Sequence, residues 1–187
     1  MTEMTVNKQR IPPAVERFIL QWGDMGVAWG VNRSVSQIHA LLYMSDKPLT
    51  AEDIADALAI ARSNVSTSLR ELLGWSLIKR VPVRGDRRDY YEAEADMLEM
   101  VRRIAIGRKV RELDPALATL RTCMAEADGD RAVSPVAKAR LKQMLDTVEG
   151  VDRSFSEIMR LPSPVLARLI RMGGAVARLV MPARKKG

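Results

Sequence analysis

Apolar residues recur every three or four positions along most of this chain, a spacing that predicts amphipathic helices. The first predicted helix runs from Ala14 to about Ala28, directly after a Pro-Pro pair. A second is expected to begin at Ser34, whose side chain would serve as its N-cap. Each helix carries one apolar face, so each is expected to bury one side.

Two short helices are predicted next, with a break of about three residues between them. Thr50 is the expected N-cap of the first, Ala51 to Ala59, and Asp53 sits three residues further on, as in a capping box. Ser63 is expected to cap the second helix and Gly74 to end it in a left-handed conformation. The outer face of the second helix is small and polar. Together the pair is typical of a helix-turn-helix.

A β-hairpin is predicted directly after these helices. The stretches "SLIKRVPV" and "DYYEAEA" are rich in Val, Ile and Tyr, and "RGDR" between them supplies turn residues. A helix-turn-helix followed by a hairpin predicts a winged helix, with the hairpin as its wing. We assign this predicted winged helix-turn-helix domain to residues 11–95.

The remainder of the chain, residues 96–187, is predicted to be helical. One helix starts near Met97 and is expected to kink or restart at Asp114-Pro115. Further helices are expected to start at Ser134-Pro135 and Ser163-Pro164. The predicted fold class is therefore mainly α with a small β-wing: a winged helix-turn-helix followed by a C-terminal helical dimerisation or effector region.

A heptad pattern on the third of these helices predicts a packing seam. Its apolar positions are Leu141, Met144, Val148, Val151, Phe155 and Ile158. The surface that covers this seam is either the last helix of the same chain or the same helix of a second chain. We expect the seam to contribute to a homodimer.

The basic residues are concentrated around the wing. The chain has a formal net charge of +7, but residues 1–94 hold 12 basic and 12 acidic side chains. Within that balanced half, Arg62 to Arg88 contains seven basic residues and only two acidic ones. A basic patch in a neutral domain favours an anionic partner.

Few residues suggest catalysis or metal binding. The chain has one histidine, His39, and one cysteine, Cys123, and it lacks a phosphate-binding glycine loop. We therefore expect neither an enzyme nor a bound metal or cofactor, and we interpret His39 as structural. Glu52, Asp53 and Asp56 are interpreted as helix N-terminal charges that the helix dipole favours.

Double-stranded DNA is the predicted partner. The second helix of the helix-turn-helix would enter the major groove, the hairpin arginines would reach the adjacent minor groove, and the flanking cations would neutralise phosphates. The residues predicted to contact DNA are Arg62, Ser63, Asn64, Ser66, Thr67, Arg70, Lys79, Arg80, Arg84, Arg87 and Arg88.

The stretches "GDRRDYYEAEAD" and "WGVNRSVSQIHALLYMSDKPLTAEDIADALAIARSNVSTSLREL" resemble the GbsR branch of the MarR-type transcriptional regulators, a likeness that covers residues 14–112. The resemblance implies a dimeric bacterial repressor that binds a pseudo-palindromic operator. It also implies that Ser63 to Leu73 is the recognition helix and that Asp86 braces Arg88 in the wing. The short N-terminal segment differs from the wider MarR pattern, in which helices at both termini build the dimer.

The same resemblance implies a small-molecule inducer, because the protein that names this branch responds to choline. Quaternary ammonium ions are bound by aromatic cages. The candidate effector pocket consists of Phe18, Trp22 and Trp29 on one helix face and Tyr43 on the next helix. Packing in the core or in a dimer explains the same pattern, and both interpretations remain open.

Two other hypotheses belong to different functional classes. A winged helix can serve as a protein-interaction module that never binds DNA. The last predicted helix is basic and amphipathic, which fits either a membrane surface or a dimer partner. No apolar stretch is long enough for stable membrane insertion, and the N-terminus lacks an apolar signal region, so a cytoplasmic location is expected.

Overall fold

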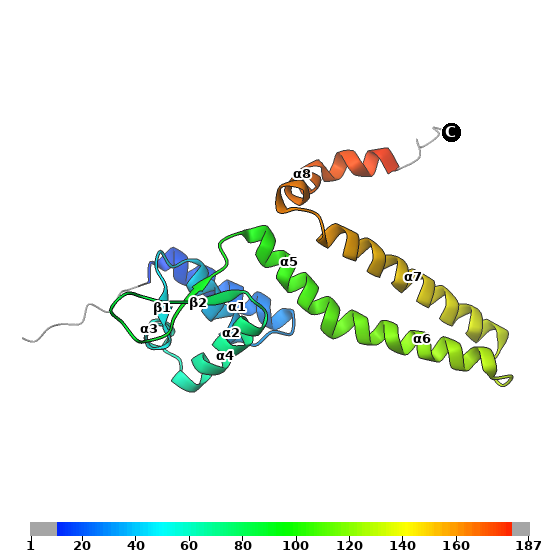
Figure 1. The fold of residues 1–187 in the computed structure, drawn as a ribbon, viewed down its shortest axis with the longest axis horizontal. Helices are drawn as coiled ribbons and strands as arrows, with labels where there is room; N and C mark the ends of the chain where they lie inside the picture. The colour runs from blue at the N-terminus through cyan, green and yellow to red at the C-terminus, as the bar shows by residue number, and fades with distance from the viewer. Residues whose placement is uncertain (1–10, 181–187) are drawn as a thin grey trace, which may run out of the picture. The chain divides into compact units, whose positions relative to one another are not determined.

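The computed structural model describes residues 11–180, the last seven of them by backbone alone. The chain divides into two compact units, one ending at Arg103 and the other beginning at Ile104. The first unit holds four helices and a small sheet, and the second is helical (Figure 1). The predicted fold class is therefore confirmed: a mainly helical protein with a small β-wing.

The first two helices pack closely against each other. They are α1 (Pro13–Ala28) and α2 (Arg33–Tyr43). A Cβ atom added at Gly26 would lie 1.9 Å from the Ser36 Oγ atom, so only glycine permits this approach. The prediction of Ser34 as the cap of α2 is wrong, because the Asn32 side chain accepts the Ser34 N–H at 2.8 Å. Asn32 lies one position before the helix, where a cap can reach that amide.

The first helix of the helix-turn-helix is α3 (Ala51–Leu58), and its predicted capping box is confirmed. The Thr50 Oγ1 atom accepts the Asp53 N–H at 3.2 Å, and the Thr50 N–H donates to the Asp53 carboxylate at 2.9 Å. Ala59 then adopts a left-handed φ of 53° and ends the helix. Three residues, 59–61, separate α3 from the next helix, as a helix-turn-helix requires.

The second helix, α4 (Arg62–Gly74), begins and ends differently from the prediction. Ser63 is not its cap, because the helix already begins at Arg62 and the capping position is Ala61, which has no polar side chain. Gly74 lies inside the helix, and Ser76 adopts the positive φ of 55° instead. Both ends of this helix therefore differ from those that capping preferences predict.

A three-stranded antiparallel sheet completes the winged helix. Its strands are β1 (Leu49–Thr50), β2 (Ile78–Val81) and β3 (Tyr90–Ala93), in the order β1-β3-β2. The predicted hairpin is β2 and β3, with Lys79 opposite Glu92 and Arg80 opposite Tyr91. The pattern analysis missed β1, because two residues are too few to show alternation.

The core of this unit joins every helix around the sheet. Its most deeply buried side chains come from α1 to α4 and the start of α5: Ile19, Ile38, Ile54, Val65, Leu72 and Met100. These contacts fix α4 by one face only, and its other face remains open to solvent.

Helical backbone continues from Met97 to Gly129 through a change of helix type. Its parts are α5 (Met97–Arg108), a π-helical turn η1 (Lys109–Leu113) and α6 (Asp114–Gly129). The predicted kink or restart at Asp114-Pro115 is thus a π-turn directly before the proline. Pro115 has no N–H to donate to the preceding turn, which explains why the α-helical pattern changes there.

In the second unit, α6 and α7 (Pro135–Met159) lie side by side, and α8 (Ser163–Val180) follows (Figure 1). The six-residue seam on α7 separates into two rows. One row is half-buried: Leu141, Val148 and Phe155. The other is exposed: Met144 and Val151 at 56% each and Ile158 at 44%. No helix in the described part of the chain is long and apolar enough to cross a bilayer.

Candidate nucleic-acid interface

The outer face of α4 carries only small or polar side chains. Val65, Ser68, Leu69 and Leu72 are buried against the core. The four residues predicted on the opposite face, Ser63, Ser66, Thr67 and Arg70, are all exposed, and so are Arg62 and Asn64. Arg70 donates a hydrogen bond to the Thr67 hydroxyl at 3.3 Å, so part of this face is already ordered. Such a face can approach base edges closely and offer hydrogen bonds to them.

The wing loop between β2 and β3 is held by Asp86. Its carboxylate accepts the Arg88 backbone N–H at 2.9 Å, the Arg88 Nη2 at 2.6 Å and the Tyr90 hydroxyl at 2.8 Å. Gly85, with φ of 84°, allows the chain to turn just before it. The structure therefore contains the Asp86–Arg88 contact that the resemblance implied.

This network perturbs the acidity of all three of its side chains. The hydrogen bonds from Arg88 hold the pKa of Asp86 well below its usual range. The same contact raises the pKa of Arg88, and the hydrogen bond to Asp86 raises the pKa of Tyr90. Asp86 thus stays ionised and the loop stays cross-linked at every pH at which the protein is expected to work.

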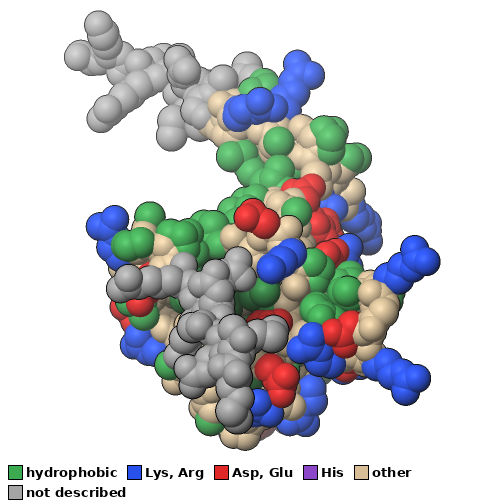
Figure 2. All heavy atoms as spheres, turned by 90° about the vertical axis from the view of Figure 1, so that its left-hand side faces the viewer, with side chains coloured by type: hydrophobic (Ala, Val, Ile, Leu, Met, Phe, Trp, Pro, Cys, Tyr) green, Lys and Arg blue, Asp and Glu red, His purple; other side chains and the backbone are tan. Residues whose placement is uncertain are grey.

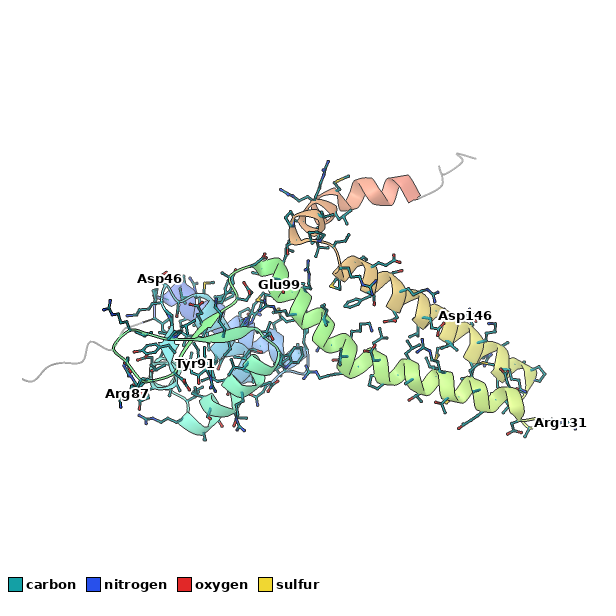
Figure 3. All side chains as sticks on the ribbon, in the orientation of Figure 1. Asp46, Arg87, Tyr91, Glu99, Arg131 and Asp146 are labelled. Carbon is teal, nitrogen blue, oxygen red and sulfur yellow. The ribbon has the colours of Figure 1, made fainter. Side chains whose placement is uncertain are left out.

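The other basic residues of the wing fall into two groups. Lys79 pairs with Glu92 across the strands at 2.8 Å, and Arg80 lies 3.8 Å from Asp89. Arg84 and Arg87 are exposed, and within residues 11–173 neither has an ion-pair partner. Arg87 lies at the outer end of the loop (Figure 3). These two arginines can therefore reach a ligand without first breaking an ion pair.

Glu52 was not predicted as part of this surface. Its Oε1 atom lies 2.9 Å from the Arg62 Nη1 atom, and its Oε2 atom lies 3.9 Å from the Arg88 Nη1 atom. Glu52 therefore connects α3, the start of α4 and the wing. Sequence reasoning assigned it only to the dipole of α3, because nothing in the linear order brings residues 52, 62 and 88 together.

The space-filling view shows Lys and Arg side chains with Asp and Glu side chains among them on this side of the molecule (Figure 2). The surface is thus of mixed charge. When an anion approaches, arginines that exchange their carboxylate partners for it determine how positive the potential of this surface becomes.

The predicted effector pocket is only partly assembled. Phe18, Trp22 and Tyr43 line one small cavity, and the Phe18 and Trp22 ring centroids lie 5.5 Å apart. Trp29 does not line this cavity and is 55% exposed, because it follows the last turn of α1. Its assignment to the pocket was wrong. The cavity encloses about 10 Å³, close to the space that one water molecule needs.

His39 completes the lining of this cavity. Its side chain is 3% exposed, and burial lowers the pKa of His39 to about 4, so the ring is neutral at neutral pH. Within the described part of the chain its Nε2 atom has no hydrogen-bond partner. The interpretation of His39 as a buried structural residue agrees with its position, but its unpaired nitrogen is an unexpected feature of the cavity.

Parts of this chain are similar to known transcriptional regulators. Residues 29–89 match the sequence model of the MarR family. The HTH-type transcriptional repressor OpcR of Bacillus subtilis (strain 168) is 26% identical over 86 residues, 46% of each chain. The HTH-type transcriptional repressor GbsR of the same organism is 23% identical over 144 residues, 73% of this chain and 77% of that protein. The chain thus spans about half the length of OpcR.

A solved structure confirms the fold. The crystal structure of a transcriptional regulator superposes with a TM-score of 0.61 at 21% identity. The match covers 79% of this chain and 96% of that one. The similarity thus extends beyond the winged helix into the helical second unit.

Proposed function

We propose that this chain is a winged-helix regulator of the MarR/GbsR type and, more specifically, a dimeric cytoplasmic repressor of transcription. It would bind double-stranded DNA at a pseudo-palindromic operator. The observation that carries the proposal is the exposed polar face of α4 beside a wing whose tip bears two unpaired arginines, Arg84 and Arg87.

The geometry supports a specific docking arrangement. Helix α4 would lie in the major groove, where its small side chains and Arg70 face base edges. Arg84 and Arg87 would enter the flanking minor groove, where the potential is more negative. Asp86 would keep the wing loop in the conformation that presents them. Arg62, Lys79 and Arg80 would contact phosphates on either side, after exchanging their carboxylate partners for DNA.

The rival hypothesis of a protein-interaction module requires apolar side chains on the outer face of α4. The exposed residues there are serine, threonine, asparagine and arginine. This composition favours DNA over a protein partner, because core positions of protein interfaces are depleted in charged residues and enriched in aromatic ones.

The two wing arginines are expected to respond differently to substitution. Arg87→Ala should lower the affinity for a DNA duplex about tenfold, the order expected for one groove contact, without changing the melting temperature. Arg88→Ala should lower both the DNA affinity and the melting temperature, because it removes the cation that pairs with Asp86 and the hydrogen bonds that hold the loop. Fluorescence anisotropy with a labelled duplex and thermal unfolding measure the two effects separately.

The matched control for this pair is Arg131→Ala, which removes the same charge from the exposed loop between α6 and α7. Its affinity should stay within about twofold of the unmodified protein, since Arg131 belongs to the second unit and its loss changes only the net charge of the chain. If Arg87→Ala and Arg131→Ala bind equally well, the wing does not contact DNA.

A small-molecule inducer is a second proposal, and the cavity at His39 supports it. The aromatic rings of Phe18, Trp22 and Tyr43 can face a cation, and the free Nε2 of His39 can accept a hydrogen bond. Choline carries both a quaternary ammonium cation and a hydroxyl group that can donate a hydrogen bond. It is far larger than the cavity, so it would have to displace some of the lining side chains. Millimolar choline should therefore raise the melting temperature and weaken DNA binding. If it changes neither, choline is not the inducer.

A further inference from the structure

The carboxylate of Glu52 lies between Arg62, which the proposed function assigns to DNA phosphates, and Arg88, which the sequence also predicts to contact DNA. It pairs with Arg62 at the start of the recognition helix at 2.9 Å and approaches Arg88 of the wing at 3.9 Å. These arginines belong to segments separated by 26 residues in the chain. Glu52 itself lies in the first turn of α3, and its side chain is 50% exposed.

Helix stability alone does not account for this placement. The dipole of α3 favours a negative charge in its first turn, but Asp53 already supplies one and closes the capping box as well. Asp56, on the same helix, is exposed and pairs with neither arginine. The contact to both arginines is therefore a property of Glu52 and not of acidic residues on α3 in general.

Each of these pairs competes with a phosphate. A guanidinium binds a carboxylate and a phosphate through the same N–H groups, so Arg62 must give up Glu52 before it can bind the DNA backbone. Arg88 is held more firmly, because Asp86 occupies its Nε and Nη2 edge while Glu52 faces its Nη1. The freed carboxylate would then face the incoming phosphates and repel them.

We propose that Glu52 acts as an internal competitor of the DNA phosphates and lowers the affinity of this protein for duplex DNA of any sequence. The proposal rests on the proposed function, since it assumes that Arg62 and Arg88 face DNA. Its consequence is that nonspecific, phosphate-driven binding is weak. A larger share of the binding free energy then comes from the contacts of α4 to bases and of Arg84 and Arg87 to the minor groove.

The test is the variant Glu52→Gln, which keeps the shape of the side chain and removes its charge. With a mixed-sequence duplex at about 50 mM salt, we expect binding to tighten about three- to tenfold, the combined effect of two exposed ion pairs that no longer compete. The salt dependence should steepen by about 0.9 in log–log slope for each additional phosphate that is neutralised. Anisotropy titrations at several salt concentrations measure both quantities.

Asp56→Asn is the matched control, because it removes one negative charge from the same helix without touching either arginine. Both variants should keep the circular dichroism spectrum of the unmodified protein. If Glu52→Gln binds no more tightly than Asp56→Asn, the effect is one of net charge only and the proposal is wrong. If Glu52→Gln binds more weakly, Glu52 positions the arginines for DNA, which also overturns the proposal.

A second variant links the effect to its assigned partner. In an Arg62→Ala background, Glu52→Gln should tighten binding by a smaller factor than in the unmodified protein, because one of the two competing pairs is already absent. An undiminished gain would contradict the assignment to Arg62. Failure of the proposed function itself would look different, since the unmodified protein would then not bind the duplex at all.

Discussion

Replacing Met144 and Val151 together with aspartate is expected to convert the proposed dimer into monomers and to weaken its binding to a two-half-site duplex about a hundredfold or more. Both side chains are 56% exposed and lie seven residues apart on α7, in line with Ile158. An apolar row at heptad spacing is typical of a helix that packs against another helix. Unpaired carboxylates in such an interface cost several kcal/mol.

The loss of DNA affinity follows from two-fold symmetry. A dimer places two recognition helices on two half-sites, so the second helix binds at high effective concentration once the first has bound. A monomer binds each half-site independently. Sedimentation velocity measures the change in mass, and anisotropy with the same duplex measures the change in affinity.

Val148→Asp provides the contrasting variant, because Val148 belongs to the half-buried row of α7. It should lower the helix content of the second unit, whereas the Met144/Val151 variant should keep its circular dichroism spectrum. If the Met144/Val151 variant remains a dimer with unchanged DNA affinity, this row is not the interface. The dimer would then have to be built from the terminal helices, α1 and α8.

Acidification is expected to destabilise the winged helix through His39. Burial lowers the pKa of His39 from 6.5 to about 4, so between these values the unfolded chain binds a proton that the folded chain does not. The contribution of His39 to stability is therefore fully present above pH 6.5 and is lost as the pH falls to 4. The shift corresponds to roughly 3 kcal/mol of unfolding free energy.

Urea titrations at pH 7, 5.5 and 4 measure this effect, with His39→Leu as the comparison. Asp86, whose pKa is lowered by folding, keeps its contribution throughout this range and loses it only at lower pH. The difference between the two proteins therefore isolates the histidine. If the unmodified protein and His39→Leu lose the same amount of stability between pH 7 and 4, His39 does not titrate in this range.

Local sequence patterns were sufficient for most of the fold. Helices α1 to α4 and the β2–β3 hairpin follow from apolar periodicity and turn residues, and the capping box followed from the spacing of Thr50 and Asp53. Helix ends were less predictable. The capping positions are Asn32 and Ala61, each two residues before the predicted caps Ser34 and Ser63, a displacement within the usual uncertainty of helix ends.

The candidate site shows the same division between local and long-range information. The exposure of the α4 face follows from its helical period, and the Asp86–Arg88 contact spans only two residues. The contacts of Glu52 depend on how α3, α4 and the wing are placed in space, which no local pattern encodes. Trp29 was misassigned because the helix face that it shares with Phe18 and Trp22 continues past the part of α1 that α2 covers. The Trp29 side chain is therefore exposed.

Hydroxyl-radical footprinting tests the central proposal most directly, on a duplex that the protein itself selects from a random library. We predict two protected regions about one helical turn apart, roughly 34–36 Å, each flanked by minor-groove protection that Arg87→Ala removes. Uniform cleavage along the duplex, or protection that Arg87→Ala leaves unchanged, would contradict the assignment of α4 and the wing as the DNA-binding surface.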